Sequence, residues 1–142
     1  MRIEKPTAEE TLSEHVAEIL PGKEALGEVM RKKKIRLYLG VDPTSPNLHL
    51  GHAVLLRKLS QFQELGHQVI LIVGDWTAQI GDPSGQSATR PMLTHEQVME
   101  NAQSYLRQFF KVVDKDRAQV VHQSEWFGKF TLADVIRLTG RF

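Results

Sequence analysis

The spacing of apolar residues along the chain predicts the order of its helices and strands. Apolar residues three or four positions apart predict helices over 7–20, 23–33, 50–65 and 94–111. Continuous apolar runs predict strands over 35–41 and 69–73, and a short strand centred on 120–121. Thr7 with Glu10 and Thr94 with Gln97 are typical of capping boxes, and Thr131 caps a last helix.

The apolar positions also predict which faces are buried. In the first helix they form a stripe that Pro21-Gly22 ends: Leu12, Val16, Ile19 and Leu20. In the helix over 50–65, which Gly66 closes, they form a wider face: Leu55, Leu56, Leu59, Phe62 and Leu65. The run 69–73 (VILIV) is typical of a central parallel strand covered on both faces.

Strands that alternate with helices predict the α/β class, with a Rossmann-like parallel sheet and flanking helices. We expect a helical arm over 1–34 and a Rossmann-like half-domain over 35–142. The sequence stops directly after a helix, with no closing strand. We therefore expect the first half of a larger domain.

Composition narrows the classes of protein that remain. The chain has 142 residues, a formal net charge of +1 and no cysteine, which excludes disulfides, zinc–thiolate sites and cysteine nucleophiles. The N-terminus has no apolar core of the kind that signal peptides carry, and the longest apolar run is too short to span a bilayer. We expect a soluble, cytoplasmic protein without membrane partners.

Two polar loops follow the first two predicted strands, where open parallel sheets bind their ligands. In the first loop, His49 and His52 stand three positions apart at the start of a helix, beside backbone N–H groups and the positive end of the helix dipole. Gly51 lies between them and would let a ligand approach the backbone. With the hydroxyl of Thr44, this arrangement favours a polyphosphate.

Alternatives to that interpretation are a surface histidine pair or half of a metal site. Zinc sites need further ligands, and no cysteine or nearby glutamate stands at ligand spacing. We therefore predict no metal bound by the protein itself.

The second loop, 74–85, contains three glycines and a proline directly after a buried strand. Such a composition favours a close approach of the backbone to a ligand. Asp82, between a glycine and a proline, could receive an ammonium group; the alternative is a plain turn with an aspartate cap.

Together the two loops resemble the class I aminoacyl-tRNA synthetases, specifically the bacterial tyrosyl-tRNA synthetase family. His49-Leu50-Gly51-His52 is similar to the HIGH motif, Asp42-Pro43-Thr44 precedes it as in the family, and residues 74–85 are similar to the tyrosine-specific second loop. The resemblance runs from about residue 7 to the C-terminus.

The resemblance implies a role for each matching residue. Tyrosine would contact Tyr38, Gly40, Asp42 and Asp82, and ATP would contact Gly40, Asp42, His49, Gly51 and His52. The groups implied in catalysis are Thr44, His49, His52 and Arg90. The implied partners are L-tyrosine, ATP with Mg²⁺ and tRNA(Tyr), and the family also implies a homodimer.

The chain departs from the family at Leu39, Leu55 and Gln86, where relatives carry other residues. It has no match to the YxxxQxxD segment or to the KMSKS loop, so we expect the isolated chain to be weak or inactive. Three alternatives stay open: a small His-x-Gly-His nucleotidylyl transferase, a non-catalytic nucleotide-binding or dimerising fragment, and a tryptophan-specific relative. Tyr38 and the Asp82 loop argue against the last.

Overall fold

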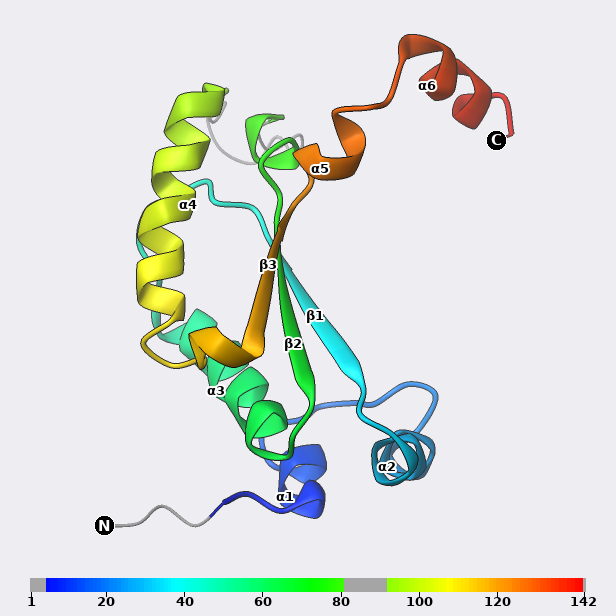
Figure 1. Ribbon diagram of the computed structural model, residues 1–142, viewed down its shortest axis with the longest axis vertical. Helices are drawn as coiled ribbons and strands as arrows, with labels where there is room; N and C mark the ends of the chain where they lie inside the picture. Colours follow the sequence, from blue (N-terminus) through cyan, green and yellow to red (C-terminus); the bar gives the residue numbers. More distant parts are fainter. Residues whose placement is uncertain (1–4, 81–91, 142) are drawn as a thin grey trace.

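The computed structural model describes residues 5–80 and 92–141 as a three-stranded parallel sheet flanked by helices (Figure 1). The elements follow in this order: α1 (Ala8–Ser13), α2 (Lys23–Lys32), β1 (Arg36–Val41), α3 (Leu50–Glu64), β2 (Gln68–Val73), the 3₁₀ turn η1 (Thr77–Gln79), α4 (His95–Phe109), the 3₁₀ turn η2 (Lys115–Arg117), β3 (Ala118–His122), α5 (Ser124–Phe127) and α6 (Leu132–Thr139). The predicted α/β class is confirmed. No helix among these residues is long and apolar enough to cross a membrane.

The strands lie in the order β1-β2-β3, so β2 is central, as the sequence predicts. The register pairs Leu39 with Leu71 and Leu71 with Val120. Right-handed crossovers that advance in one direction place their helices on the same face of a sheet. Accordingly, α3 and α4 share one core with β2, built on Leu56, Leu71 and Phe109.

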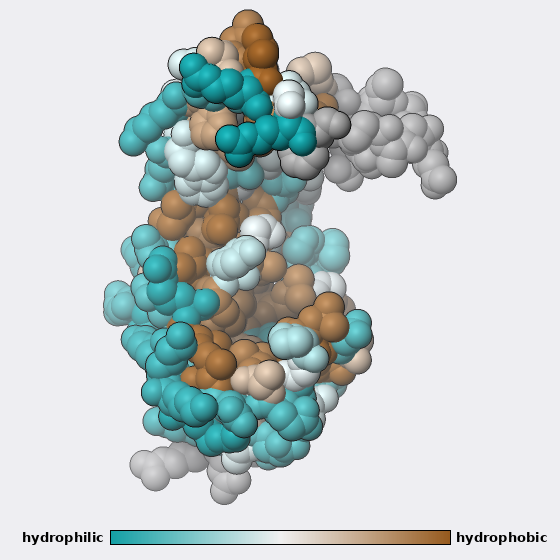
Figure 2. Space-filling view, turned by 90° about the vertical axis from the view of Figure 1, so that its right-hand side faces the viewer, coloured by the Kyte–Doolittle hydropathy of each residue, from teal (hydrophilic) through white to brown (hydrophobic). Residues whose placement is uncertain are grey.

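The expectation that β2 is covered on both faces holds for four of the residues 69–73, which are buried, and fails at Ile72. On β1, exposed and half-buried residues alternate, and Arg36, Tyr38 and Gly40 lie on the exposed face. Ile72, which pairs with Gly40, is only half-buried. Figure 2 shows a broad apolar area across the middle of the molecule on the β1 side. Ile70, which pairs with Tyr38 on this face, is buried, so the face is open along β1 and at Ile72 rather than throughout.

The first helix is shorter than its apolar stripe predicts. Its capping box between Thr7 and Glu10 is present, but α1 ends at Ser13 rather than near Leu20. The ammonium of Lys58, on α3, donates to the carbonyls of Thr11 (2.8 Å) and Glu14 (2.9 Å), which satisfies carbonyl groups at the end of α1. His15 follows with a φ of 54°, outside helical geometry.

The other helices begin and end close to their predicted limits. Thr94 and Thr131 form capping boxes at the starts of α4 and α6. Gly66, with a φ of 90°, follows α3, and the amide of His67 donates to the carbonyl of Phe62 as in a Schellman motif. On α3 itself, Leu56 is buried whereas Leu55 is 50% exposed, so the predicted apolar face is too wide.

Candidate functional site

A pocket of about 340 Å³ lies at the carboxyl ends of the strands. Its lining comes from β1, β2 and the segments that follow β2 and β3: Gly40, Val41, Asp42, Ile72, Gly74, Thr77 and Gln123. This is where open parallel sheets bind their ligands. Gly40 and Asp42, both predicted as site residues, meet here.

A network of hydrogen bonds builds the floor of this strand-end pocket. The Oγ1 of Thr77 lies 2.6 Å from the Oδ1 of Asp42 and 3.0 Å from the Oε1 of Gln123. The amide of Thr77 also donates to the Oε1 of Gln123 (3.2 Å). Thr77 thus joins the ends of all three strands. The sequence alone assigns no role to Thr77 or to Gln123, because neither has a local signal.

Gly74 has to be glycine for this network to form. A Cβ there would lie 1.9 Å from the Oδ1 of Asp42 and 2.5 Å from the Oγ1 of Thr77. Gly40 differs, because a Cβ built on it meets nothing within 4 Å. The open space beside Gly40 belongs to the exposed face of β1, which also carries Tyr38, a residue that is 72% exposed.

The second part of the site is the pair of imidazoles at the start of α3. The ring centroids of His49 and His52 lie 4.0 Å apart, which confirms that the two side chains share one face. The amide of Gly51 donates to the Nδ1 of His49 (3.1 Å), and the amide of His49 donates to the Nδ1 of His52 (3.2 Å). Each Nδ1 is therefore an acceptor, so a neutral ring carries its proton on Nε2.

These bonds correct one expectation about the first loop. The amides of His49 and Gly51 are not free for a phosphate, because the two imidazoles already accept from them. The space beside Gly51 is also taken, since a Cβ there would lie 2.9 Å from the Cε1 of His49. The side-chain donors that the motif offers are the two Nε2–H groups.

The environment of His52 favours its neutral form. Burial, and after it the neighbouring imidazole of His49, lower the pKa of His52. The ring of Tyr105, on α4, packs edge-on against His52 with centroids 6.0 Å apart. The neutral ring keeps the tautomer just described, with one hydrogen-bond donor at Nε2.

The structure places the two parts of the site at opposite ends of the loop 42–49, and the imidazoles are not among the residues that line the strand-end pocket. Thr44 lies between them and is tied to Asp42 by a backbone hydrogen bond of 2.7 Å. Asn101 and Gln108 on α4 hold this loop through its backbone, and sequence reasoning missed both. Asp82, Gln86 and Arg90 lie outside the described residues.

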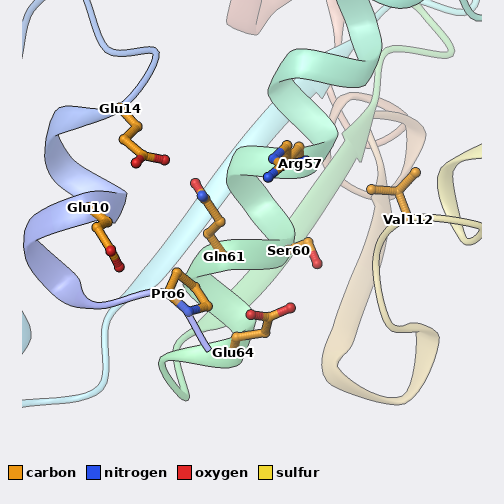
Figure 3. A pocket seen from close by; sticks show the side chains of 8 residues that line it. All are labelled: Pro6, Glu10, Glu14, Arg57, Ser60, Gln61, Glu64 and Val112. Carbon is orange, nitrogen blue, oxygen red and sulfur yellow. The ribbon is translucent and has the colours of Figure 1, made fainter. Parts of the chain in front are cut away.

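A separate pocket, of about 310 Å³, lies along α3 on the side of α1 (Figure 3). Its polar lining includes three carboxylates and one guanidinium: Glu10, Glu14, Glu64 and Arg57. The carboxylate of Glu10 already accepts from the amide of Thr7 in the capping box (2.7 Å). No predicted site residue lines this pocket.

Across residues 5–80 and 92–141, no three metal-ligating side chains gather closely enough to hold a metal ion.

Comparisons with known proteins agree with this geometry. The family described as tRNA synthetases class I (W and Y) matches residues 30–142. The chain is 58% identical to a tyrosine–tRNA ligase of Dehalococcoides mccartyi strain CBDB1 over 94% of its length, and 52% identical to one of Thermotoga maritima over 92%. It covers 34% and 33% of those two proteins, so the chain spans about a third of their length.

A solved structure supports the same relationship. The tyrosyl-tRNA synthetase of Archaeoglobus fulgidus, solved with L-tyrosine, superimposes with a TM-score of 0.73 at 25% identity. The match covers 94% of this chain and 38% of that one. The fold of the chain is thus found in a solved tyrosyl-tRNA synthetase.

Proposed function

The chain belongs to the class I tRNA synthetases of the tryptophan and tyrosine group, and on that basis we propose that it is the ATP-binding part of a tyrosine–tRNA ligase. The enzyme would activate L-tyrosine with ATP and transfer the tyrosyl group to tRNA(Tyr) in the cytoplasm. The observation that carries the proposal is the pair of imidazoles at the start of α3. Both present an Nε2–H donor at the positive end of a helix.

The proposed chemistry is a single displacement at phosphorus. An oxygen of the tyrosine carboxylate bonds to the α-phosphorus of ATP, and the bond from that phosphorus to the bridging oxygen breaks. Pyrophosphate leaves with the electron pair. Because the reaction needs no covalent enzyme intermediate, the protein works by alignment and by stabilising developing charge.

Within that reaction, the hydroxyl of Thr44 and the Nε2–H of His49 would donate to the departing phosphates, as would Arg90. His52 would contact the nucleotide. Charge builds on the leaving group in the transition state, so these donors should matter more there than in bound ATP. Mg²⁺ would arrive on the ATP phosphates.

Tyrosine would lie against the exposed face of β1. Tyr38 would meet the phenol of the substrate, Gly40 and Asp42 would form the floor, and Asp82 would bind the ammonium. Tyr38 is 72% exposed, so this pocket is open on one side, and we expect the chain alone to be weak or inactive. That openness favours a second candidate function, a fragment that binds nucleotide without turnover.

A homodimer is also part of the proposal. The helix α6 projects away from the sheet (Figure 1) and exposes apolar side chains, among them Leu132 at 75% and Ile136 at 61%. Exposed apolar surface of this kind is typical of an interface. We propose that a second copy of the protein covers it.

Ligand titrations of the ¹⁵N-labelled chain test the proposal. We expect Mg-ATP to shift the amide signals of Gly51 and His52, and L-tyrosine to shift those of Tyr38 and Gly40. Phosphopantetheine, the substrate of the small nucleotidylyl transferases, is the matched control and should shift none. Shifts caused by phosphopantetheine but not by tyrosine would contradict the proposal.

A further inference from the structure

One helix, α4, supplies the side chains that hold the loop between Asp42 and His49. The Nδ2 of Asn101 donates to the carbonyl of Pro43 (3.1 Å), and the Nε2 of Gln108 donates to the carbonyl of Pro46 (2.8 Å). Asn101 and Gln108 lie two helical turns apart and therefore on the same face of α4. The loop is fastened along its length to a single helix.

Gln108 makes the more specific of these attachments. While its Nε2 donates to Pro46, its Oε1 accepts from the amide of Leu48 (3.1 Å). A side-chain amide has both a donor and an acceptor, so it can fix two peptide groups at once. Leu48 directly precedes His49, the N-cap residue of α3, so Gln108 fixes the two peptide groups that lead into the residue carrying the first imidazole.

At its two ends the loop is also held by other contacts, since Thr77 donates to Asp42, Pro43 is buried and Leu48 packs on the main core. Its own hydrogen bonds are local: the amide of Thr44 donates to the carbonyl of Asp42 (2.7 Å), and the amide of Asn47 lies 3.5 Å from the Oγ of Ser45. Local bonds shape a turn but do not place it against a sheet. Beyond Asp42, the hydrogen bonds that tie the described loop to another element come from α4.

We propose that Gln108 is a positioning residue, which holds the Pro46–Leu48 segment so that His49 presents its Nε2–H to the phosphates of ATP. This inference rests on the proposed function. Tyr105 lies between Asn101 and Gln108 on α4 and packs against His52, so the same helix contacts both ends of the motif. Gln108 acts on the substrate only through the loop.

Three variants of the full chain test this role. Gln108→Met keeps the length of the side chain and removes both polar groups, whereas Gln108→Glu keeps an acceptor for Leu48 and loses the donor to Pro46. Gln103→Met is the matched control, because Gln103 is an exposed glutamine on the same helix. Two quantities are measured at pH 7: the ¹⁵N imidazole signals of His49, which report its tautomer, and the Kd of Mg-ATP.

We expect Gln108→Met to lose the single Nε2–H tautomer of His49 and to weaken ATP binding about tenfold, the scale set by two lost hydrogen bonds. Gln108→Glu should show a smaller effect, and Gln103→Met should match the parent chain. If Gln108→Met lowers only the Tm, with the His49 tautomer and the Kd unchanged below that temperature, Gln108 has a structural role and the inference is wrong.

The two proposals can fail separately. If the parent chain does not bind Mg-ATP, the proposed function fails for this chain. The imidazole spectra of His49 then still decide whether Gln108 positions it. The tautomer reports whether His49 keeps the N-cap position in which its Nδ1 accepts from the amide of Gly51, and this needs no ligand.

Discussion

The hydroxyl of Thr77 lies 2.6 Å from the carboxylate of Asp42, and this contact joins the end of β1 to the turn that follows β2. The two residues are far apart in the sequence and meet only because β1 and β2 pair in parallel. Gly74 leaves the space in which they meet. The geometry of the strand-end pocket therefore depends on a residue without a side chain.

Gly74→Ala should lower the free energy of unfolding by about 1–3 kcal/mol, because the new methyl group would overlap with Asp42 and Thr77. Chemical denaturation measures this loss. Gly40→Ala is the matched control, since its methyl group enters open space, and its stability should stay within about 0.5 kcal/mol of the parent. Equal losses in the two variants would contradict the packing described here.

Tyr105→Phe should leave the stability unchanged or raise it by up to about 1 kcal/mol. The ring of Tyr105 is buried, and its hydroxyl has no hydrogen-bond partner among the described residues. A buried hydroxyl without a partner costs free energy that phenylalanine does not incur. Thermal unfolding of the two proteins decides the sign. A marked loss of stability would mean that the hydroxyl has a partner in solution.

Stability should fall as the pH drops below about 6.5. Burial, followed by the charge of Lys34, lowers the pKa of His67, whose Nδ1 accepts from the amide of Ile35 (3.4 Å). Because the pKa of His67 is lower in the folded chain than in the unfolded chain, the unfolded chain binds the proton first as the pH falls. The contribution of His67 to the free energy of unfolding is therefore fully present above the pKa of the unfolded chain. It is lost as the pH falls through the pKa of the folded chain.

Denaturation curves between pH 7.5 and 5 measure this dependence. His67→Gln removes the group and should make the loss of stability shallower. His95→Gln, at an exposed position on α4, serves as the control and should keep the slope of the parent. A slope in His67→Gln as steep as in the parent would rule out His67 as its source.

The interface proposed on α6 predicts a dimer that depends on concentration. Analytical ultracentrifugation of the chain should show dimers, and Ile136→Lys should shift them to monomers, since a charge in an apolar interface is costly. Arg137→Gln changes a charge at an exposed position that is already polar and should leave the dimer intact. A parent chain that stays monomeric at all concentrations contradicts this part of the account.

The sequence predicts most of the fold because its signals are local. Thr94 and Thr131 each form a capping box with the residue three positions later, and this pair marks the start of a helix. Gly66 marks the end of a helix because glycine readily adopts the positive φ found there. The end of α1 has no such signal. It depends on Lys58, which lies more than forty positions away and takes the carbonyls that a longer helix would have used.

The same difference separates the parts of the site. The pairing of His49 with His52 follows from their spacing on one helix, and the sequence predicts it. Gln108 and Gln123 act through contacts with residues more than forty positions away, and a lone glutamine has no recognisable pattern. Only the three-dimensional structure brings them to the site.

The central claim is that the imidazole of His49 belongs to a site that adenylates tyrosine. The most direct measurement is tyrosine-dependent exchange of labelled pyrophosphate into ATP. For this measurement, the chain is combined with the part of the Dehalococcoides mccartyi enzyme that lies outside the region matched by the chain. We predict exchange, and a loss of about 2–4 kcal/mol of transition-state stabilisation in His49→Ala, as for the removal of an oxyanion donor. Absence of exchange, or exchange that His49→Ala leaves unchanged, would contradict the account.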